Sequence, residues 1–176
     1  MYISTYQSPL GGITLAGSGS RLAGLWFDGQ AYFASGLPEQ CEKKELPVFS
    51  QAKKWLDIYF SGTAPDFMPL ISMDGISPFR RRVWEMLLAI PFGQTSTYGK
   101  IARQIAAETG KAVSAQAVGG AVGHNSLSVI IPCHRVVGTD GSLTGYAGGI
   151  SRKLSLLKLE GADVSRFTVP KRGTAV

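Results

Sequence analysis

Residues 95–122 read TSTYGKIARQIAAETGKAVSAQAVGGAV, and this stretch indicates the fold more strongly than any other. Apolar residues recur at helical spacing over residues 98–108, and Gly110 breaks the pattern. Ser114 is then placed to cap a second helix over residues 115–122. Two short helices joined by a glycine-containing turn are typical of a helix-turn-helix. Helical hairpins also occur in proteins that never bind DNA, so the pattern by itself leaves DNA binding open.

The second of these helices is unusually slim. Gly119 and Gly120 lie inside it, and glycines in a helix cost about 1 kcal/mol each relative to alanine. Two explanations account for such a cost. The glycines allow either close packing against another helix or close approach to a nucleic-acid groove, including the narrow minor groove. The sequence leaves both explanations open.

The sequence upstream of residue 77 predicts a different kind of structure. Alternating runs separated by the turn-forming residues 17–20 indicate a small antiparallel sheet. A helical pattern follows, and then a linker rich in Gly, Pro, Ser and Asp. The expected strands cover residues 2–6, 12–16 and 22–27, the helix covers residues 47–60, and the linker covers residues 62–78.

The sequence downstream of the boundary predicts mainly helices. Ser77 and Pro78 open a helix that ends before Pro91. Residues 128–131 form a β-branched run typical of a buried strand, and Pro132 ends it because proline has no N–H for a ladder. The remaining segments are a loop at residues 138–149, a helix at residues 151–160 capped by Gly161, and a frayed tail that follows Gly161 and ends with residues 171–174.

The expected fold class is therefore α+β with two domains. A small N-terminal α/β domain with an antiparallel sheet occupies residues 1–76, and a helical C-terminal domain containing the helix-turn-helix occupies residues 77–176. The charge divides at the same boundary. Residues 1–76 hold five Lys/Arg and seven Asp/Glu, a net charge of −2, whereas residues 77–176 hold thirteen and five, a net charge of +8. This asymmetry points to nucleic acid as a partner, with a basic surface kept for solubility as the alternative.

The composition excludes several classes of protein. A content of 44% hydrophobic and 17% charged residues indicates a folded chain rather than a disordered one. No run approaches the roughly 18 apolar residues of a transmembrane helix, and the N-terminus does not resemble a signal peptide. Cys41 and Cys133 are too few for a disulfide framework or a thiolate zinc site. We expect a cytoplasmic protein without a membrane partner or a bound metal.

Cys133 is the candidate nucleophile because His134 and Arg135 follow it directly. Thiols react as thiolates, and His134 can take the proton directly or through a water. The alternative is a buried cysteine that packs as a small hydrophobe. Glu160 ends its helix, where the helix dipole disfavours a carboxylate, and such adverse placements are often functional. If Glu160 bonds His134, the three residues form a nucleophile–base–orienter relay, whereas the alternative is a solvated surface carboxylate.

These residues belong to a larger pattern. The sequence IPCHRVV at residues 131–137 resembles the PCHRV active-site signature of the O6-alkylguanine-DNA alkyltransferases. Other parts of the chain resemble further motifs of that family, namely TYG at 97–99 with IA at 101–102, AVGGA at 117–121, GYAGG at 145–149 followed by Lys153 and a Leu pair at 156–157, and LEG at 159–161. The resemblance spans residues 77–161, and Gly11-Gly12 with the following strand suits the family's N-terminal domain.

The resemblance implies a mechanism of direct-reversal DNA repair. Cys133 would accept the alkyl group irreversibly, His134 would deprotonate it through a water, and Glu160 would orient His134. Asn125 stands at the hinge position that ties the recognition helix to the active-site strand. Tyr98 would push on the target phosphate or donate a proton to guanine as the alkyl group leaves.

The resemblance also implies the partner. The partner is double-stranded DNA bound through the minor groove, with O6-alkylguanine flipped out of the stack and O4-alkylthymine as a further candidate substrate. The protein would act once, as a monomer, without a cofactor. The residues expected to contact DNA or the flipped base are Gln116, Ala117, Gly119, Arg135, Thr139 and Tyr146.

Gln116 departs from the family pattern, because an arginine usually stands directly before AVGGA and replaces the flipped nucleotide in the stack. Glutamine can bond the orphaned cytosine, but it is shorter and uncharged. Ala147 stands where the family often has serine. Two rival functions stay open, namely a protein that binds alkylguanine in DNA without repairing it and a cysteine hydrolase using Cys133, His134 and Glu160.

Overall fold

The computed structural model of the chain describes residues 1–170. Contacts divide the chain into two compact units, one formed by residues 1–74 with 126–130 and the other by residues 75–125 with 131–176. The tail after Gly161 was expected to be frayed, but Thr168 within it is held: its N–H donates to Gly141 O at 3.0 Å, and its carbonyl accepts the N–H of Leu143 at 3.0 Å. Residues 171–174, the end of that tail, lie outside the described residues. No helix among residues 1–170 combines the length and the apolar character needed to cross a membrane.

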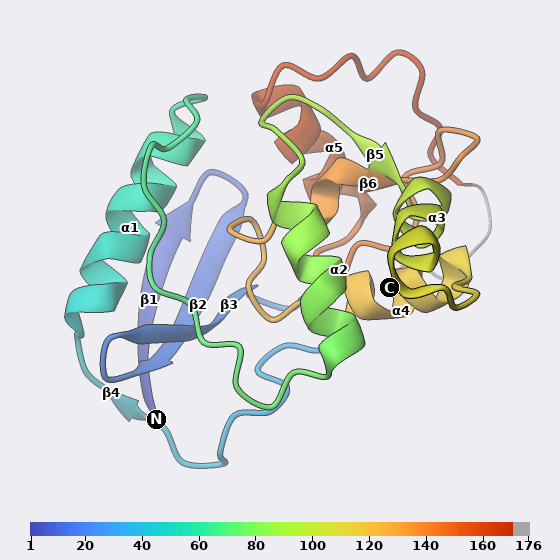
Figure 1. The fold of residues 1–176 in the computed structure, drawn as a ribbon. Helices are drawn as coiled ribbons and strands as arrows, with labels where there is room; N and C mark the ends of the chain where they lie inside the picture. The colour runs from blue at the N-terminus through green and yellow to red at the C-terminus, as the bar shows by residue number, and fades with distance from the viewer. Residues whose placement is uncertain (171–176) are drawn as a thin grey trace. The chain divides into compact units, whose positions relative to one another are not determined.

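The first unit is built on a four-stranded sheet with the strand order β3-β2-β1-β4 (Figure 1). The predicted antiparallel strands are confirmed as β1 (Tyr2–Ser8), β2 (Gly11–Ser18) and β3 (Arg21–Phe27), whereas β4 (Glu42–Lys43) runs parallel to β1 and was not predicted. Helix α1 (Pro47–Phe60) begins at a proline and contacts the sheet. Its buried face contains Val48, Phe49, Ala52, Trp55, Leu56 and Tyr59.

Two segments distant in sequence pair with β3. The expected linker contributes one of them, because the N–H of Leu22 donates to Leu70 O at 2.8 Å and the N–H of Ser72 donates to Leu22 O at 2.8 Å. The other is residues 126–130, where Leu25 exchanges backbone hydrogen bonds with Ser126 and Ser128 at 2.7 and 2.9 Å. Part of the linker therefore belongs to the fold of the first unit.

The strand predicted at residues 128–131 is wrong, because these residues form a buried turn. Val129 has a φ of +70°, and the N–H of Ile130 donates back to Ser128 O at 2.9 Å. β-Branched residues favour strands because they fit a pleated surface. Here residues 128–131 are all buried, and their segment pairs with β3 only through Leu25. Burial, and not a β-ladder, therefore explains the β-branched composition of this run.

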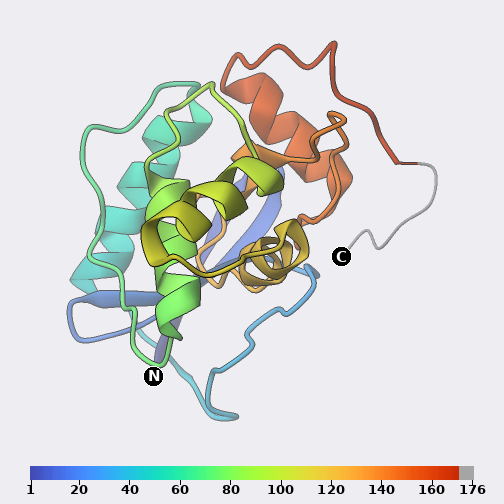
Figure 2. The ribbon, with the colours of Figure 1, turned by 45° about the vertical axis from the view of Figure 1, so that its right-hand side comes forward.

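Up to residue 170, the second unit contains four α-helices, α2 (Pro78–Leu88), α3 (Tyr98–Thr109), α4 (Ala115–Gly123) and α5 (Ile150–Leu159). The predicted helix-turn-helix is confirmed, since α3 and α4 pack together and α2 contacts both (Figures 1 and 2). The hydroxyls of Ser77, Thr97 and Ser114 cap α2, α3 and α4 by accepting backbone N–H groups.

The centre of the second unit is irregular, and the sequence did not predict its elements. The 3₁₀ turn η1 (Cys133–Arg135) leads into β6 (Val136–Val137), which pairs in parallel with β5 (Ser96–Thr97) immediately before α3. This pairing places the residues that follow Cys133 beside the start of the helix-turn-helix. A small apolar cluster of Val137, Leu143 and Leu157 packs β6 against α5.

Candidate active site

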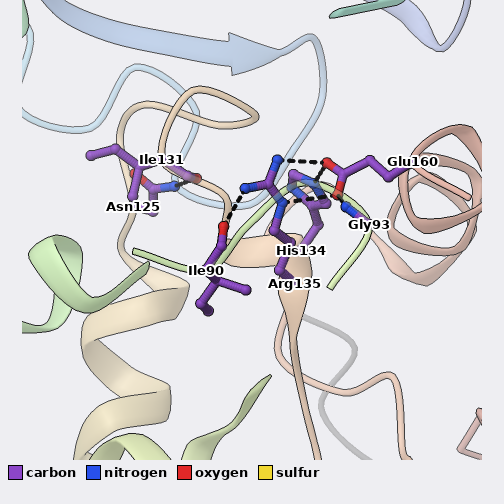
Figure 3. A network of polar contacts seen from close by, with 7 residues as sticks. All are labelled: Ile90, Gly93, Asn125, Ile131, His134, Arg135 and Glu160. Carbon is purple, nitrogen blue, oxygen red and sulfur yellow. Dashed lines mark hydrogen bonds and ion pairs between the residues drawn. The ribbon is translucent and has the colours of Figure 1, made fainter. Parts of the chain in front are cut away.

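Cys133 is the first residue of η1 and is 2% exposed. The side-chain amide of Asn125 donates to Cys133 Sγ at 3.0 Å. It also donates to the carbonyl of Ile131 at 2.8 Å (Figure 3). Burial raises the pKa of the Cys133 thiol, and the bond from Asn125 and the charge of Lys153 oppose that rise. The resting thiol is therefore protonated at neutral pH, and a base must remove its proton before it can act as a nucleophile.

His134 and Glu160 form a buried pair. His134 Nε2 lies 2.6 Å from Glu160 Oε1, and neither side chain is exposed (Figure 3). Burial alone would raise the pKa of Glu160, but the bonds and charges of His134 and Arg135 lower it to about 2. Burial lowers the pKa of His134 despite the carboxylate. A neutral imidazole beside an anion must donate through Nε2–H, which assigns the lone pair to Nδ1 and makes that atom the base.

Arg135, which was expected to contact DNA, holds Glu160 from the other side. Its Nε donates to Glu160 Oε2 at 2.9 Å, and a terminal nitrogen donates to Oε1 at 3.0 Å. The other terminal nitrogen donates to the carbonyl of Ile90 at 2.6 Å (Figure 3). Arg135 is 9% exposed, and all three of its nitrogens are engaged inside the protein. A buried carboxylate needs such a counter-charge, because desolvation of an unpaired anion is costly.

Gly93 completes the environment of Glu160. Its N–H donates to Glu160 Oε2 at 3.0 Å. The φ of Gly93 is +77°, and a Cβ at this position would lie 2.7 Å from the backbone oxygen of Glu160. Only glycine fits both the conformation and the close approach. In the sequence, Gly93 stands two residues after Pro91, just past a predicted helix end, and this position does not by itself indicate a contact with Glu160.

Lys153 and Tyr98 meet at one backbone carbonyl. Lys153 Nζ donates to Thr144 O at 2.8 Å, and the Tyr98 hydroxyl donates to the same oxygen at 2.9 Å. Lys153 is fully buried, and burial lowers its pKa to about 8 against the opposing effect of Cys133. Burial raises the pKa of Tyr98, with a smaller contribution from Cys133. Gly145 makes this geometry possible, since a Cβ there would lie 2.6 Å from the Tyr98 hydroxyl oxygen.

Tyr146 lies beside the histidine rather than on the surface. Its ring meets the His134 ring edge-on, with centroids 6.3 Å apart and an interplanar angle of 80°. Tyr146 is 1% exposed, and its hydroxyl has no hydrogen-bond partner within residues 1–170. Burial raises its pKa well above the usual value, so the hydroxyl remains protonated. A neutral, buried donor is thus present in the site.

The remaining predicted DNA contacts lie outside this buried cluster. Gln116 and Ala117 are exposed on α4, Gly119 is half-buried, and Thr139 is exposed in the loop after β6. Apart from the neighbouring residues and backbone of α4 itself, nothing within residues 1–170 lies within 4 Å of a Cβ placed on Gly120, and a Cβ on Gly119 would only touch Tyr98 at 4.0 Å. Close packing against another helix therefore does not account for these glycines. No group of three or more His, Cys, Asp or Glu side chains suited to a metal ion occurs within residues 1–170.

The chain matches two family models that together span most of its length. Residues 1–70 match the ribonuclease-like domain of 6-O-methylguanine DNA methyltransferase, and residues 78–162 match the DNA-binding domain of the same family. Several relatives carry the name methylated-DNA–protein-cysteine methyltransferase, and two of them illustrate the similarity. The one from Mycobacterium bovis is 44% identical over 161 residues, covering 91% of this chain and 92% of the relative. The one from Haemophilus influenzae is 37% identical over 160 residues, covering 91% and 86%.

Solved structures show the same relationship. The crystal structure of Mycobacterium tuberculosis OGT in complex with DNA superimposes with a TM-score of 0.78 at 42% identity, covering 95% of each chain. A structure described as Mycobacterium tuberculosis O6-methylguanine methyltransferase gives a TM-score of 0.74 at 41% identity, covering 97% of this chain and 96% of the other. The chain therefore belongs to the methylated-DNA–protein-cysteine methyltransferase family.

Proposed function

We propose that this protein repairs DNA by moving an alkyl group, such as methyl, from O6 of guanine to Cys133. Family membership supports the reaction, and one observation carries the assignment of the acceptor: the Cys133 thiol lies buried beside Asn125, next in sequence to the His134–Glu160 pair. The Sγ–carbon bond forms as the carbon–O6 bond breaks, and the electron pair of that bond leaves with the guanine. The product is a thioether, which has no evident route back to a thiol, so each molecule acts once.

The proton path follows from the tautomer of His134. Nδ1 takes the thiol proton through a water, while Glu160 holds the ring by accepting from Nε2. The charge of Glu160 also stabilises the imidazolium that forms. Tyr98 supplies a proton to the departing guanine and recovers one from the imidazolium. Asn125 serves as the hinge, because its amide bonds both Ile131 O and Cys133 Sγ. No step calls for a cofactor.

The proposed partner is double-stranded DNA, entered through the minor groove by α4. The family relationship to an enzyme solved with DNA supports the partner. The exposed Gln116 and Ala117 and the slim Gly119 support the groove, because bulk would block entry to a narrow one. The alkylated base must leave the stack, because its O6 cannot meet a thiolate in line while stacked. Tyr146 would then line the pocket for the flipped base, and Thr139 would contact the strand.

The proposed organisation gives DNA binding and the acceptor to residues 77–176, with residues 1–76 in a supporting role. We propose that one chain acts alone, as a monomer, and that it works in the cytoplasm. Cys41 and Cys133 are both free thiols, which suits a reducing compartment. O4-alkylthymine is a further candidate substrate.

A duplex carrying a single O6-methylguanine tests the proposal. Cys133→Ser should abolish removal of the methyl group and leave duplex binding nearly intact, because a hydroxyl is a far poorer nucleophile and phosphate contacts do not need the thiol. Cys41→Ser is the matched control and should repair normally. Repair at a comparable rate by Cys133→Ser would exclude Cys133 as acceptor, and binding without repair by the unaltered protein would favour a non-catalytic alkylguanine-binding protein.

A further inference from the structure

Five residues join the two side chains that meet at the acceptor. Residues 126–130 begin directly after Asn125 and end directly before Ile131, two residues before Cys133. The Asn125 amide closes this segment into a loop, because it donates to Ile131 O at 2.8 Å and to Cys133 Sγ at 3.0 Å. The position of residues 126–130 therefore determines how Asn125 and Cys133 approach each other.

The segment itself is held by the first unit, and Gln30 provides the side-chain contact. Gln30 Oε1 accepts the hydroxyl of Ser128 at 3.0 Å and the backbone N–H of Phe27 at 2.9 Å. Gln30 is 6% exposed and Ser128 is 1% exposed, so water does not compete for these bonds. One amide oxygen thus fastens the end of β3 to the middle of the loop, 98 residues further along the chain.

The residue after Ser128 shows that the loop is held under constraint. Val129 is buried and has a φ of +70°, a region that β-branched residues rarely occupy. Such a conformation persists only where the surroundings over-determine it, and it tends to occur at functional sites. The preceding residue, Ser128, is held by the two bonds that it donates, one from its N–H to Leu25 O and one from its hydroxyl to Gln30 Oε1, and these bonds hold the turn in place. The proposed mechanism makes no use of Gln30, Ser128 or Val129.

We infer that Gln30 is a positioning residue for alkyl transfer, acting through Ser128 to hold the loop that sets the contact between Asn125 and Cys133. The inference rests on the proposed function. Loss of the Gln30 oxygen frees Ser128 and lets the loop relax from its strained turn, which displaces Asn125 from Sγ. A displacement of this kind slows the chemical step, because the reacting atoms must be held close to their attack geometry. It leaves the DNA-contacting face of α4 unchanged.

Single-turnover methyl transfer from an O6-methylguanine duplex tests the inference, in a Cys41→Ser background where Cys133 is the sole thiol. Gln30→Met keeps the side-chain volume and removes the accepting oxygen. We expect the rate at saturating DNA to fall about tenfold and the half-saturating DNA concentration to stay within about twofold. Ser128→Ala, a smaller change that preserves folding if Gln30→Met does not, should slow the saturated rate in the same way. The double variant should be no slower than Gln30→Met, since the bond that Ser128→Ala removes is already absent from Gln30→Met.

Ser4→Ala is the matched control. Ser4 lies on β1 and, like Ser128, is a buried serine, but its hydroxyl bonds Glu45 and not residues 126–130. We expect its saturated rate to equal that of the parent. The inference would be overturned by an unchanged saturated rate in Ser128→Ala, by a loss confined to DNA affinity, or by an equal fall in the rate of Ser4→Ala. In each of these cases, methyl transfer by the parent protein would leave the proposed function standing. Absence of transfer in the parent would instead overturn the proposed function, and the inference with it.

Discussion

Arg135→Met distinguishes a residue that supports Glu160 from one that binds DNA. The substitution removes two bonds to the Glu160 carboxylate and one to Ile90 O. Breaking a buried ion pair costs about 3–5 kcal/mol, because the charge left behind has lost its partner. Glu160 keeps its bonds from His134 and Gly93, so we expect a value near the lower end, about 3 kcal/mol.

Two measurements on each variant decide the matter, namely urea unfolding and the salt dependence of binding to undamaged duplex. Arg135→Met should lower the free energy of unfolding by about 3 kcal/mol and leave the slope of log affinity against log salt unchanged. Arg103→Met is the matched control, because Arg103 is exposed on α3. It should reduce the salt slope by about 1 and change stability by less than about 0.5 kcal/mol. The reverse pattern, with Arg135→Met fully stable but weaker in its salt-dependent binding, would refute the internal role of Arg135.

Three further predictions concern the recognition helix and the surroundings of Glu160. Gln116→Arg should tighten DNA binding or speed transfer, because arginine adds stacking and a charge-assisted hydrogen bond about twice as strong as a neutral one. Slower single-turnover repair by Gln116→Arg, with no effect of Gln116→Ala, would show that this side chain does not fill the vacated base position. Glu160 has its pKa lowered from 4.5 to about 2, so its contribution to stability is complete above pH 4.5 and is lost as the pH falls to about 2. That contribution is about 2–3 kcal/mol, and urea unfolding between pH 5 and pH 2.5 should show a smaller loss in Glu160→Gln than in the unaltered protein. Gly93→Ala should lower the free energy of unfolding by about 2 kcal/mol or more and slow transfer, because the added methyl group meets Glu160 O. Gly110 also has a positive φ but has open space around it, so Gly110→Ala should cost about 1 kcal/mol and leave transfer unchanged. Equal effects of the two substitutions would contradict the close approach at Gly93.

The sequence predicts local features better than contacts between distant segments. The helices around the turn at Gly110 follow from apolar spacing and caps, which are local properties, and the structure contains them. The pairing of His134 with Glu160 was expected from the family resemblance and from an adverse helix-end position. No local pattern shows that Arg135 points inward, because an arginine beside a nucleophile looks the same whether it pairs with DNA or with a buried carboxylate. The turn at residues 128–131 was missed for a related reason, since a β-branched run reports burial and not the partner that buries it.

Gln30 and Lys153 show where the sequence is least informative. In the sequence, Gln30 is a polar residue in a loop, and its bond to Ser128 becomes apparent only once folding brings the two residues together. Lys153 is fully buried on α5, although lysine is rarely buried, and its apolar spacing on that helix is the one sequence signal of its position. The family motif includes Lys153, but the pattern assigns no contact to it. Both cases depend on long-range contacts that hydrophobic periodicity does not encode.

Irreversible transfer of the methyl group to Cys133 can be tested by measuring the mass of the intact protein and then mapping its peptides. The protein is incubated with an excess of duplex containing O6-methylguanine, and the mass is recorded against time. We expect one methylene-sized increment per chain, located on Cys133, with no further increase when fresh duplex is added. An increment on Cys41, or continued removal of methyl groups by a protein of unchanged mass, would contradict irreversible transfer to Cys133.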